Sequence, residues 1–340
     1  MPFRPALAAL AALALSSCAW MERTPAPAPA PAAETAPAPE PASAPAPAAE
    51  APPPPPATTA AAAPPVIAVP AQVHPALWKI ADADTTIWLF GTIHALPQDM
   101  QWEDARIAQA VATADSLTIE TLIDREHPEK LAATLFGMGV SPGLPPFLDR
   151  IGADRRAALQ TMIGRSGIPA AAFDRMETWA GAFLLVGVTL QDLGLASGSG
   201  AEDLLQAQFR AAHKPIAGLE TVEQQLGFFD TLPEEAQRQF LVTLVEDPAQ
   251  TRAEFTRMLA AWATGDEAAI AATFDEEIEI SPKLREVLLH DRNLRWTDWL
   301  VARMAQPGKL FVAVGAGHLA GDDSVITMLR ARGMTVERVQ

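Results

Sequence analysis

The sequence of 340 residues has no tyrosine, a single cysteine and few basic side chains. Without tyrosine, no phenol can act as a catalytic acid or as a haem ligand. The lone cysteine, Cys18, excludes an internal disulfide framework and a thiolate-rich metal site. Asp and Glu number 41 against 25 Lys and Arg, which gives a net charge of −16. Such an acidic chain repels phosphate groups and anionic lipids, so we expect no nucleic-acid partner and no polybasic membrane patch.

The first 17 residues have the features of a lipoprotein signal peptide. Met1–Arg4 carries one positive charge, and Pro5–Leu15 is apolar but too short to span a bilayer. The following Leu15–Cys18 resembles the bacterial lipobox, in which the chain is cleaved before the cysteine and lipid is attached to it. A cysteine buried by chance is the alternative. Ala19 in place of an aspartate favours the outer membrane, so we expect a lipid anchor in the cell envelope, in the outer membrane facing the periplasm.

Residues 18–70 are expected to comprise the lipidated cysteine and a disordered Pro/Ala-rich tether. More than half of the 31 prolines lie in this stretch, including the run Pro52–Pro56. Proline disfavours helix, removes backbone donors and extends the residue before it, so the stretch predicts an extended spacer. A proline-rich ligand for a partner domain is the alternative. The remaining residues, 71–340, are enough for one large domain.

Residues 71–340 alternate apolar, strand-like runs with segments of helical spacing, which is typical of α/β proteins. Two short runs around Asp82–Asp84 predict a hairpin. The apolar segment Thr178–Gln191 is too short for a transmembrane span and predicts a buried helix. Thr231 with Glu234 predicts a capping box at the start of a later helix. We expect a compact, helix-rich α/β domain with a mixed β-sheet.

The expected elements are named by residue number. The strands are 77–80, 86–90, 116–120, 215–218, 310–314 and 335–339, and the helices are 103–114, 128–136, 154–163, 174–193, 201–212, 231–246, 283–289 and 323–332.

Side chains capable of catalysis follow the expected strands. Gly91–His94 and Gly315–His318 each place a glycine at a strand exit and a histidine three residues later. Glu120 and Glu220 each close a strand. Because pockets of open α/β sheets lie beyond the carboxyl ends of the strands, we expect these side chains to share a cleft. Two imidazoles and two carboxylates suit a hydrolytic divalent-metal site, whereas an isolated Gly-x-x-His is ordinarily explained by a hydrogen-bonded structural histidine.

At these residues the sequence resembles the TraB/GumN family of bacterial proteins, which is related to the animal Tiki proteins and more distantly to erythromycin-esterase and ChaN-like folds. The resemblance is carried by both Gly-x-x-His motifs, by Glu120 and by the surrounding blocks, which cover about 77–122, 198–226 and 288–339. The blocks include Leu77–Ile80, Gly200–Glu202, Gly218–Thr221, Asp291–Asn293, Phe311–Leu319 and Arg332–Met334. The stretches 127–195 and 230–285 carry no family motif.

The resemblance implies a compact α/β fold in which the two Gly-x-x-His elements and a glutamate act together. In the Tiki branch these elements serve a metal-dependent protease that acts on extracellular protein, which implies a peptide or protein substrate. His94 and His318 match the two histidines, and Glu120 matches the glutamate. Glu220 and Arg292 match further family positions whose roles are less settled, and Gly91 and Gly315 are the motif glycines.

Our hypothesis is that His94 and His318 hold a divalent ion (manganese, cobalt or zinc) and that Glu120 or Glu220 completes the ligand set. The other glutamate would act as general base on a water molecule, and Arg292 would stabilise developing negative charge. No His-Glu-x-x-His helix is present, which excludes the commoner zinc-protease arrangement.

Two other classes of function stay open. The same cleft could bind a peptide, haem or another small ligand without catalysis, or the polar cluster could be structural in a non-catalytic envelope protein. Trp296 and Trp299 have the spacing of core residues. The remaining histidines are expected to be structural or exposed: His74, His127, His213 and His290.

Overall fold

The structure is a computed structural model that describes residue 67 and residues 70–98, 100–196, 198–245, 247–278 and 282–340. The expected signal peptide and almost all of the expected tether lie outside the described residues. The strands are β1 Leu77–Ala81, β2 Thr85–Thr92, β3 Ser116–Thr121, β4 Ile216–Glu220, β5 Gly308–Gly315 and β6 Glu337–Arg338.

The helices outnumber the strands in the described part of the chain. They are α2 Ala105–Thr113, α3 Pro128–Met138, α4 Arg156–Arg165, α5 Ala170–Phe173, α6 Thr178–Leu193, α7 Ala201–Ala211, α8 Val222–Asp230, α9 Glu234–Leu244, α10 Pro248–Ala263, α11 Glu267–Ile278, α12 Pro282–Arg285, α13 Asp291–Arg303 and α14 Val325–Ala331. Two 3₁₀ turns, η2 Phe147–Arg150 and η4 Ala316–Leu319, and a π-helical turn, η3 Glu286–His290, complete the list.

The strands form one mixed sheet in the order β4-β3-β5-β2-β1-β6. The four strands from β4 to β2 run parallel, whereas β1 pairs antiparallel with both β2 and β6. The hairpin of β1 and β2 pairs Ala81 with Thr86, as the sequence predicts. The expected helix-rich α/β domain with a mixed sheet is therefore confirmed.

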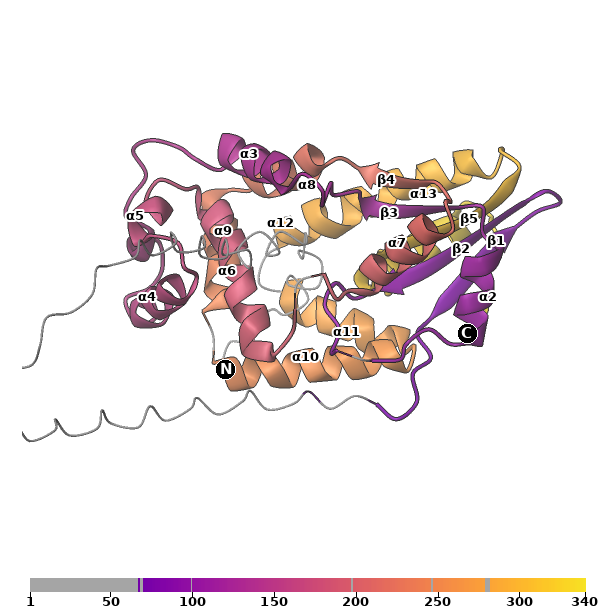
Figure 1. The fold of residues 1–340 in the computed structure, drawn as a ribbon, viewed down its shortest axis with the longest axis horizontal. Helices are drawn as coiled ribbons and strands as arrows, with labels where there is room; N and C mark the ends of the chain where they lie inside the picture. Colours follow the sequence, from indigo (N-terminus) through magenta and orange to yellow (C-terminus); the bar gives the residue numbers. More distant parts are fainter. Residues whose placement is uncertain (1–66, 68–69, 99, 197, 246, 279–281) are drawn as a thin grey trace, which may run out of the picture.

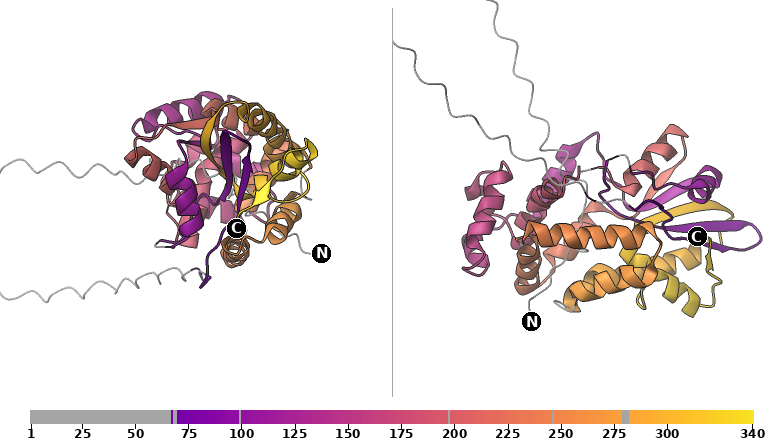
Figure 2. Two further views of the ribbon diagram at one scale, coloured as in Figure 1. Left: turned by 90° about the vertical axis from the view of Figure 1, so that its right-hand side faces the viewer. Right: turned by 90° about the horizontal axis from the view of Figure 1, so that it is seen from below.

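Both faces of the sheet are covered, because its central strands are apolar on both sides. On β5, Leu310, Val312 and Val314 pack on one face, while Phe311 and Ala313 pack on the other. Helices α13 and α14 cover the first face, and α2 and α7 lie over the second (Figures 1 and 2). Continuous burial of this kind is the sequence signature of a central parallel strand.

The remaining helices extend the molecule beyond the carboxyl ends of the parallel strands. Figure 1 shows α3 to α6 and α9 at the end opposite the β1–β2 hairpin. Helix α6 is buried along most of its length, which confirms the buried helix predicted from its apolar stretch. Within the described residues, no helix combines the length and hydropathy needed to span a membrane.

One expected helix start is wrong. Thr231 does not cap a helix that contains Glu234; it is the C-cap of α8, and its hydroxyl donates back to the carbonyl of Gly227 at 2.9 Å. The next helix, α9, begins after Pro233. The residue before a proline is disfavoured in the helical region, so the chain must leave one helix before it enters the next.

Candidate active site

Four neighbouring parallel strands bring the predicted residues to one edge of the sheet. Strands β2 and β5 are adjacent, with Thr92 paired to Gly315, so both Gly-x-x-His motifs leave the sheet side by side. His94 lies in the loop after β2, and His318 lies in η4 directly after β5. Glu120 and Glu220 come from β3 and β4 at the same edge, and Arg292 reaches the cluster from α13. The structure therefore brings all five residues together.

Arg292 lies between the two carboxylates. Its Nη2 donates to Glu120 Oε2 at 2.7 Å and to Glu220 Oε2 at 2.8 Å, and its Nε donates to both oxygens of Glu220 at 3.1 Å. Trp296 donates its indole N–H to Glu220 Oε1 at 3.1 Å and lies under the guanidinium. Both oxygens of Glu220 are thus engaged inside the protein. Arg292 is only 2% exposed, so this ion-pair network is fully buried.

The same network keeps Glu120 ionised. Burial raises the pKa of Glu120, but the nearby charges of Arg292, His318 and His94 and the Gly315 N–H outweigh it and lower the pKa to about 2. Glu120 Oε1 accepts the Gly315 N–H at 2.6 Å, and Oε2 also accepts from Gln225 at 3.2 Å.

His94 is held through one ring nitrogen and leaves the other without a partner. Its Nδ1 contacts Glu202 Oε1, whereas its Nε2 is buried and has no hydrogen-bond partner among the described residues. Burial lowers the pKa of His94, but Glu202, Glu120 and Asp203 overcome that effect and raise the pKa to about 9. In the protein as described, His94 is therefore a cation at neutral pH.

The start of α7 places Glu202 against His94. Gly200 is the N-cap of α7, and a Cβ at this position would lie 2.4 Å from the His94 carbonyl oxygen, so only glycine fits there. The Ala201 N–H donates to the Ile93 carbonyl at 3.0 Å, which fixes the loop after β2 to the helix. Gly200–Glu202 is one of the blocks that carry the family resemblance, but no role for Glu202 could be predicted from the sequence.

His318 is held in the same manner by a neutral partner. Its Nδ1 lies 2.6 Å from Asn293 Oδ1, its Nε2 lies 3.2 Å from Arg292 Nη1, and its ring centroid is 4.4 Å from that of Trp296. Burial, helped by Arg292 and His94 and opposed by Glu120, lowers the pKa of His318 to about 3. His318 is therefore neutral. Asn293 stands in the Asp291–Asn293 block, yet only Arg292 was expected to act.

Gly315 leaves a small space between the three central side chains. A Cβ on Gly315 would lie 3.1 Å from Glu120 Oε1, 3.6 Å from His318 Cδ2 and 3.8 Å from His94 Nε2. These three groups therefore surround a point that any larger residue would fill. Gly91, the other motif glycine, lets the backbone at Ala316 pack closely against β2, since a Cβ at position 91 would lie 3.0 Å from the Ala316 Cα.

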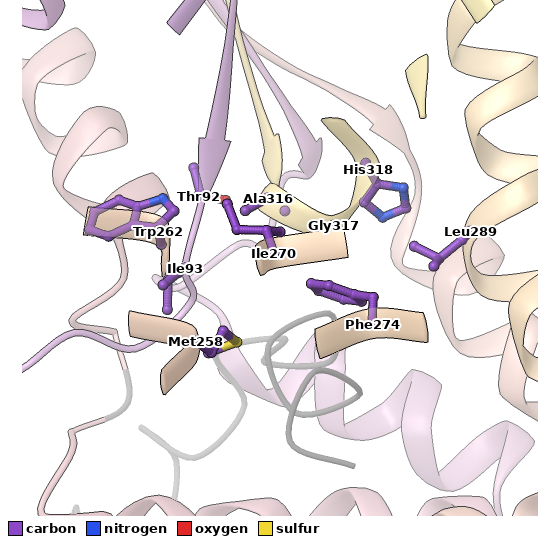
Figure 3. Close-up of a pocket in the computed structure, with 11 residues that line it drawn as sticks. Thr92, Ile93, Met258, Trp262, Ile270, Phe274, Leu289, Ala316, Gly317 and His318 are labelled. Carbon is purple, nitrogen blue, oxygen red and sulfur yellow. The ribbon is translucent and has the colours of Figure 1, made fainter. Parts of the chain in front are cut away.

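Two hollows adjoin the cluster. Beside His318 is a narrow apolar pocket, in which Phe274 lies against Gly317 and Trp262, Met258 and Ile270 form the far wall (Figure 3). Its free volume of about 10 Å³ is close to the space of one water molecule.

The second hollow is a groove of about 430 Å³ that Glu220 also lines. It lies between α3 and the turn from β4 to α8, with Leu122 and Leu131 among its apolar residues and Lys130 and Glu223 among its polar ones. A volume of this size lies in the range of ligand sites.

The donor set fits a divalent cation only if two present interactions are replaced. His94 Nε2 is buried and has no hydrogen-bond partner among the described residues. The Nδ1 of each histidine contacts a side-chain oxygen, as is usual for histidines that bind a metal through Nε2. His318 Nε2 lies 3.7 Å from Glu120 Oε1. A cation here must replace the proton on His94 and the hydrogen bond from Arg292 to His318. In the residues that the structure describes, no group of three or more His, Cys, Asp or Glu side chains is already spaced to hold a metal.

The fold and the site define an α/β protein with two Gly-x-x-His elements joined to a buried Glu-Arg-Glu network. The chain belongs to the TraB/PrgY/gumN family, whose model matches residues 76–338. This confirms the family resemblance of the sequence. No solved structure matches the chain significantly.

Relatives in three bacteria share this domain. The chain is 29% identical over 250 residues to the uncharacterized protein YbaP of Escherichia coli (strain K12), which covers 71% of this chain and 87% of the relative, and the same values hold for YbaP of Shigella flexneri. An uncharacterized protein of Treponema pallidum (strain Nichols) is 22% identical over 272 residues, covering 75% of this chain and 80% of the relative. The names of these relatives assign no activity.

Proposed function

We propose that the protein is a cell-envelope hydrolase that acts on peptide or protein substrates with a divalent cation held by His94, His318 and Glu120. The observation that carries the proposal is the space beside Gly315, around which two histidines and one carboxylate are grouped. Nitrogen and oxygen donors of this kind suit manganese, cobalt or zinc. When bound, the cation supplies Lewis-acid polarisation and lowers the pKa of water.

The contacts of the two glutamates support different roles for them. Glu120 Oε1 faces the shared space, which favours Glu120 as the ligand. Glu220 has both oxygens engaged by Arg292 and Trp296, so it is better suited to anchor Arg292 than to bind a cation or accept a proton. Arg292 Nη1 donates to His318 Nε2 next to the shared space, where it can stabilise negative charge that develops on a substrate.

We place the protein in the outer membrane, facing the periplasm, through lipid on Cys18. The support is the sequence alone: the lipobox-like Leu15–Cys18 follows a short apolar segment and precedes a proline-rich stretch. The proposal concerns where the hydrolase acts, and it is independent of the chemistry of the site.

A peptide-binding lipoprotein without catalysis is the second candidate. The groove of about 430 Å³ beside Glu220 favours it, because a groove of that size can hold a ligand whether or not a bond is cleaved. Haem binding has less support, since the pocket beside His318 has a free volume of about 10 Å³, far less than a porphyrin needs.

Metal analysis of the purified protein, together with an assay of peptide hydrolysis, tests the proposal. We expect about one cation per chain after incubation with manganese, cobalt or zinc, and loss of both the cation and hydrolysis in His94→Ala and His318→Ala. His290→Ala is the matched control, because His290 contacts Asp323 outside the cluster. Equal metal content in all four proteins would rule out the cation site, and metal without hydrolysis would favour the binding protein.

A further inference from the structure

We infer that Glu202 and Asn293 are positioning residues, which fix hydrogen on Nδ1 of His94 and His318. His94 Nε2 then faces the shared space beside Gly315, and His318 Nε2 lies next to that space, 3.7 Å from Glu120 Oε1. The inference rests on the proposed function for its consequence, the binding of a cation. Its structural content, the hydrogen that each partner fixes on Nδ1, can be tested without any metal.

Two independent contacts determine the tautomer of His318. Asn293 Nδ2 donates to the Asp323 carbonyl at 2.7 Å, so Asn293 Oδ1 is the atom that faces the ring, and an oxygen can only accept. On the other side of the ring, Arg292 can only donate, so His318 Nε2 must be the acceptor. Both contacts require hydrogen on Nδ1 and a lone pair on Nε2.

A carboxylate holds hydrogen on His94 Nδ1, although this ring, as a cation, carries hydrogen on both nitrogens. Glu202 Oε1 can only accept when ionised, so His94 Nδ1 carries hydrogen. Glu202 is 9% exposed, and the contacts of Gly200 and Ala201 with the loop after β2 keep the helix start in place. The ring is therefore held at a fixed angle, with its unpartnered Nε2 turned inward.

The two partners differ in charge, and this difference has a chemical consequence. A carboxylate on the distal nitrogen makes an imidazole a stronger electron donor than a neutral amide does. His94 with Glu202 is therefore the stronger of the two donors, and His318 with Asn293 is the weaker. Loss of such a partner lowers metal affinity about 10- to 100-fold in metal sites generally.

Titration calorimetry with Mn²⁺ on the full chain measures the consequence. We expect Glu202→Leu and Asn293→Leu to weaken Mn²⁺ binding about 10- to 100-fold, and Glu202→Gln and Asn293→Asp, which keep an accepting oxygen, to restore most of the affinity. Gln237→Leu is the control for lost stability, because Gln237 is a buried, hydrogen-bonded side chain that contacts neither histidine. Leucine variants that bind Mn²⁺ like the wild type would overturn the positioning role.

Nitrogen-15 spectra of histidine in the metal-free protein separate this inference from the proposed function. We expect the His318 signal, assigned by its loss in His318→Gln, to show a protonated Nδ1 and an unprotonated Nε2, and Asn293→Leu to lose that preference. A wild-type protein that binds no Mn²⁺ but has this spectrum refutes the cation and supports the positioning role. A protonated Nε2 on His318 refutes the positioning role whatever the metal result.

Discussion

At the scale of single residues, one guanidinium makes the buried site possible. Glu120 and Glu220 are 6% and 7% exposed, and two carboxylates so deeply buried are tolerated only with a compensating charge. Arg292 supplies that charge to both carboxylates, and it also donates a hydrogen bond to His318 Nε2. The burial of both carboxylates therefore depends on this side chain.

Removal of that side chain should destabilise the fold. We expect Arg292→Met to lower the free energy of unfolding by about 3–5 kcal/mol, because it removes the buried positive charge that compensates two buried carboxylates. Arg295→Met is the matched control: Arg295 is 3.6 Å from Glu220 but 52% exposed, so its loss should change stability by no more than about 1 kcal/mol. Urea unfolding measures both, and similar losses in the two variants would contradict the network described here.

The stability of the metal-free protein should fall with acid because of His318. Its pKa is about 3 in the folded state and 6.5 in the reference state, so between these values the unfolded chain binds a proton that the folded chain does not. Stability from this group is therefore complete above pH 6.5 and is lost as the pH falls towards 3. Urea midpoints measured in chelator should show the difference between wild type and His318→Gln shrinking over this range. A constant difference would mean that His318 is not buried in its neutral form.

The residues that could be predicted from the sequence are those with a motif. His94, His318 and Glu120 stand at recognisable strand ends, and the structure does bring them together. Glu202 and Asn293 could not be given roles, because a hydrogen bond to a ring nitrogen has no local pattern. Glu202 is 108 positions from its histidine, and only the packing of Gly200 on the loop after β2 joins them.

At the scale of elements, the sheet could be predicted better than the helices around it. Strands β2 and β5 have apolar runs that end in glycine, and their adjacency follows from the rule that catalytic loops gather at one edge of a parallel sheet. Helices α10 and α11 lie in the stretch 230–285, which had no motif, and they supply Trp262 and Phe274 to the pocket beside His318 (Figure 3). Amphipathic spacing predicts that a helix forms, but it does not predict which face of the fold it covers.

Short elements depended on tertiary contacts that the sequence does not display. Strand β6 is limited to two residues, Glu337 and Arg338, where a longer strand was expected. Its pairing is with Trp78 and Lys79 at the edge of the sheet, and Arg338 stacks over the Trp78 ring. A short edge strand limits the row of unpaired backbone groups that could pair with another chain, and an apolar pattern does not predict that length.

At the scale of the whole molecule, the proline-rich extension precedes the region that the family defines. The family match begins at residue 76 and the first strand begins at Leu77, although Ile67, within the proline-rich stretch, is buried against the core. A net charge of −16 opposes binding to anionic lipid surfaces, which leaves covalent lipid as the means of attachment that the sequence supports. The site and the proposed lipid anchor should therefore be separable by mutation.

Loss of the anchor should release the protein without unfolding it. We expect Cys18→Ala to move the protein from the membrane fraction to the soluble fraction and to abolish labelling by a fatty-acid analogue, because Cys18 is the only thiol in the chain. The urea midpoint should not change, since Cys18 precedes the residues that the family model matches.

Deletion of residues 24–66 is the control: it shortens the proposed tether but keeps Cys18, so the protein should stay with the membrane. If Cys18→Ala stayed in the membrane fraction after an alkaline wash, an attachment other than thiol-linked lipid would be required.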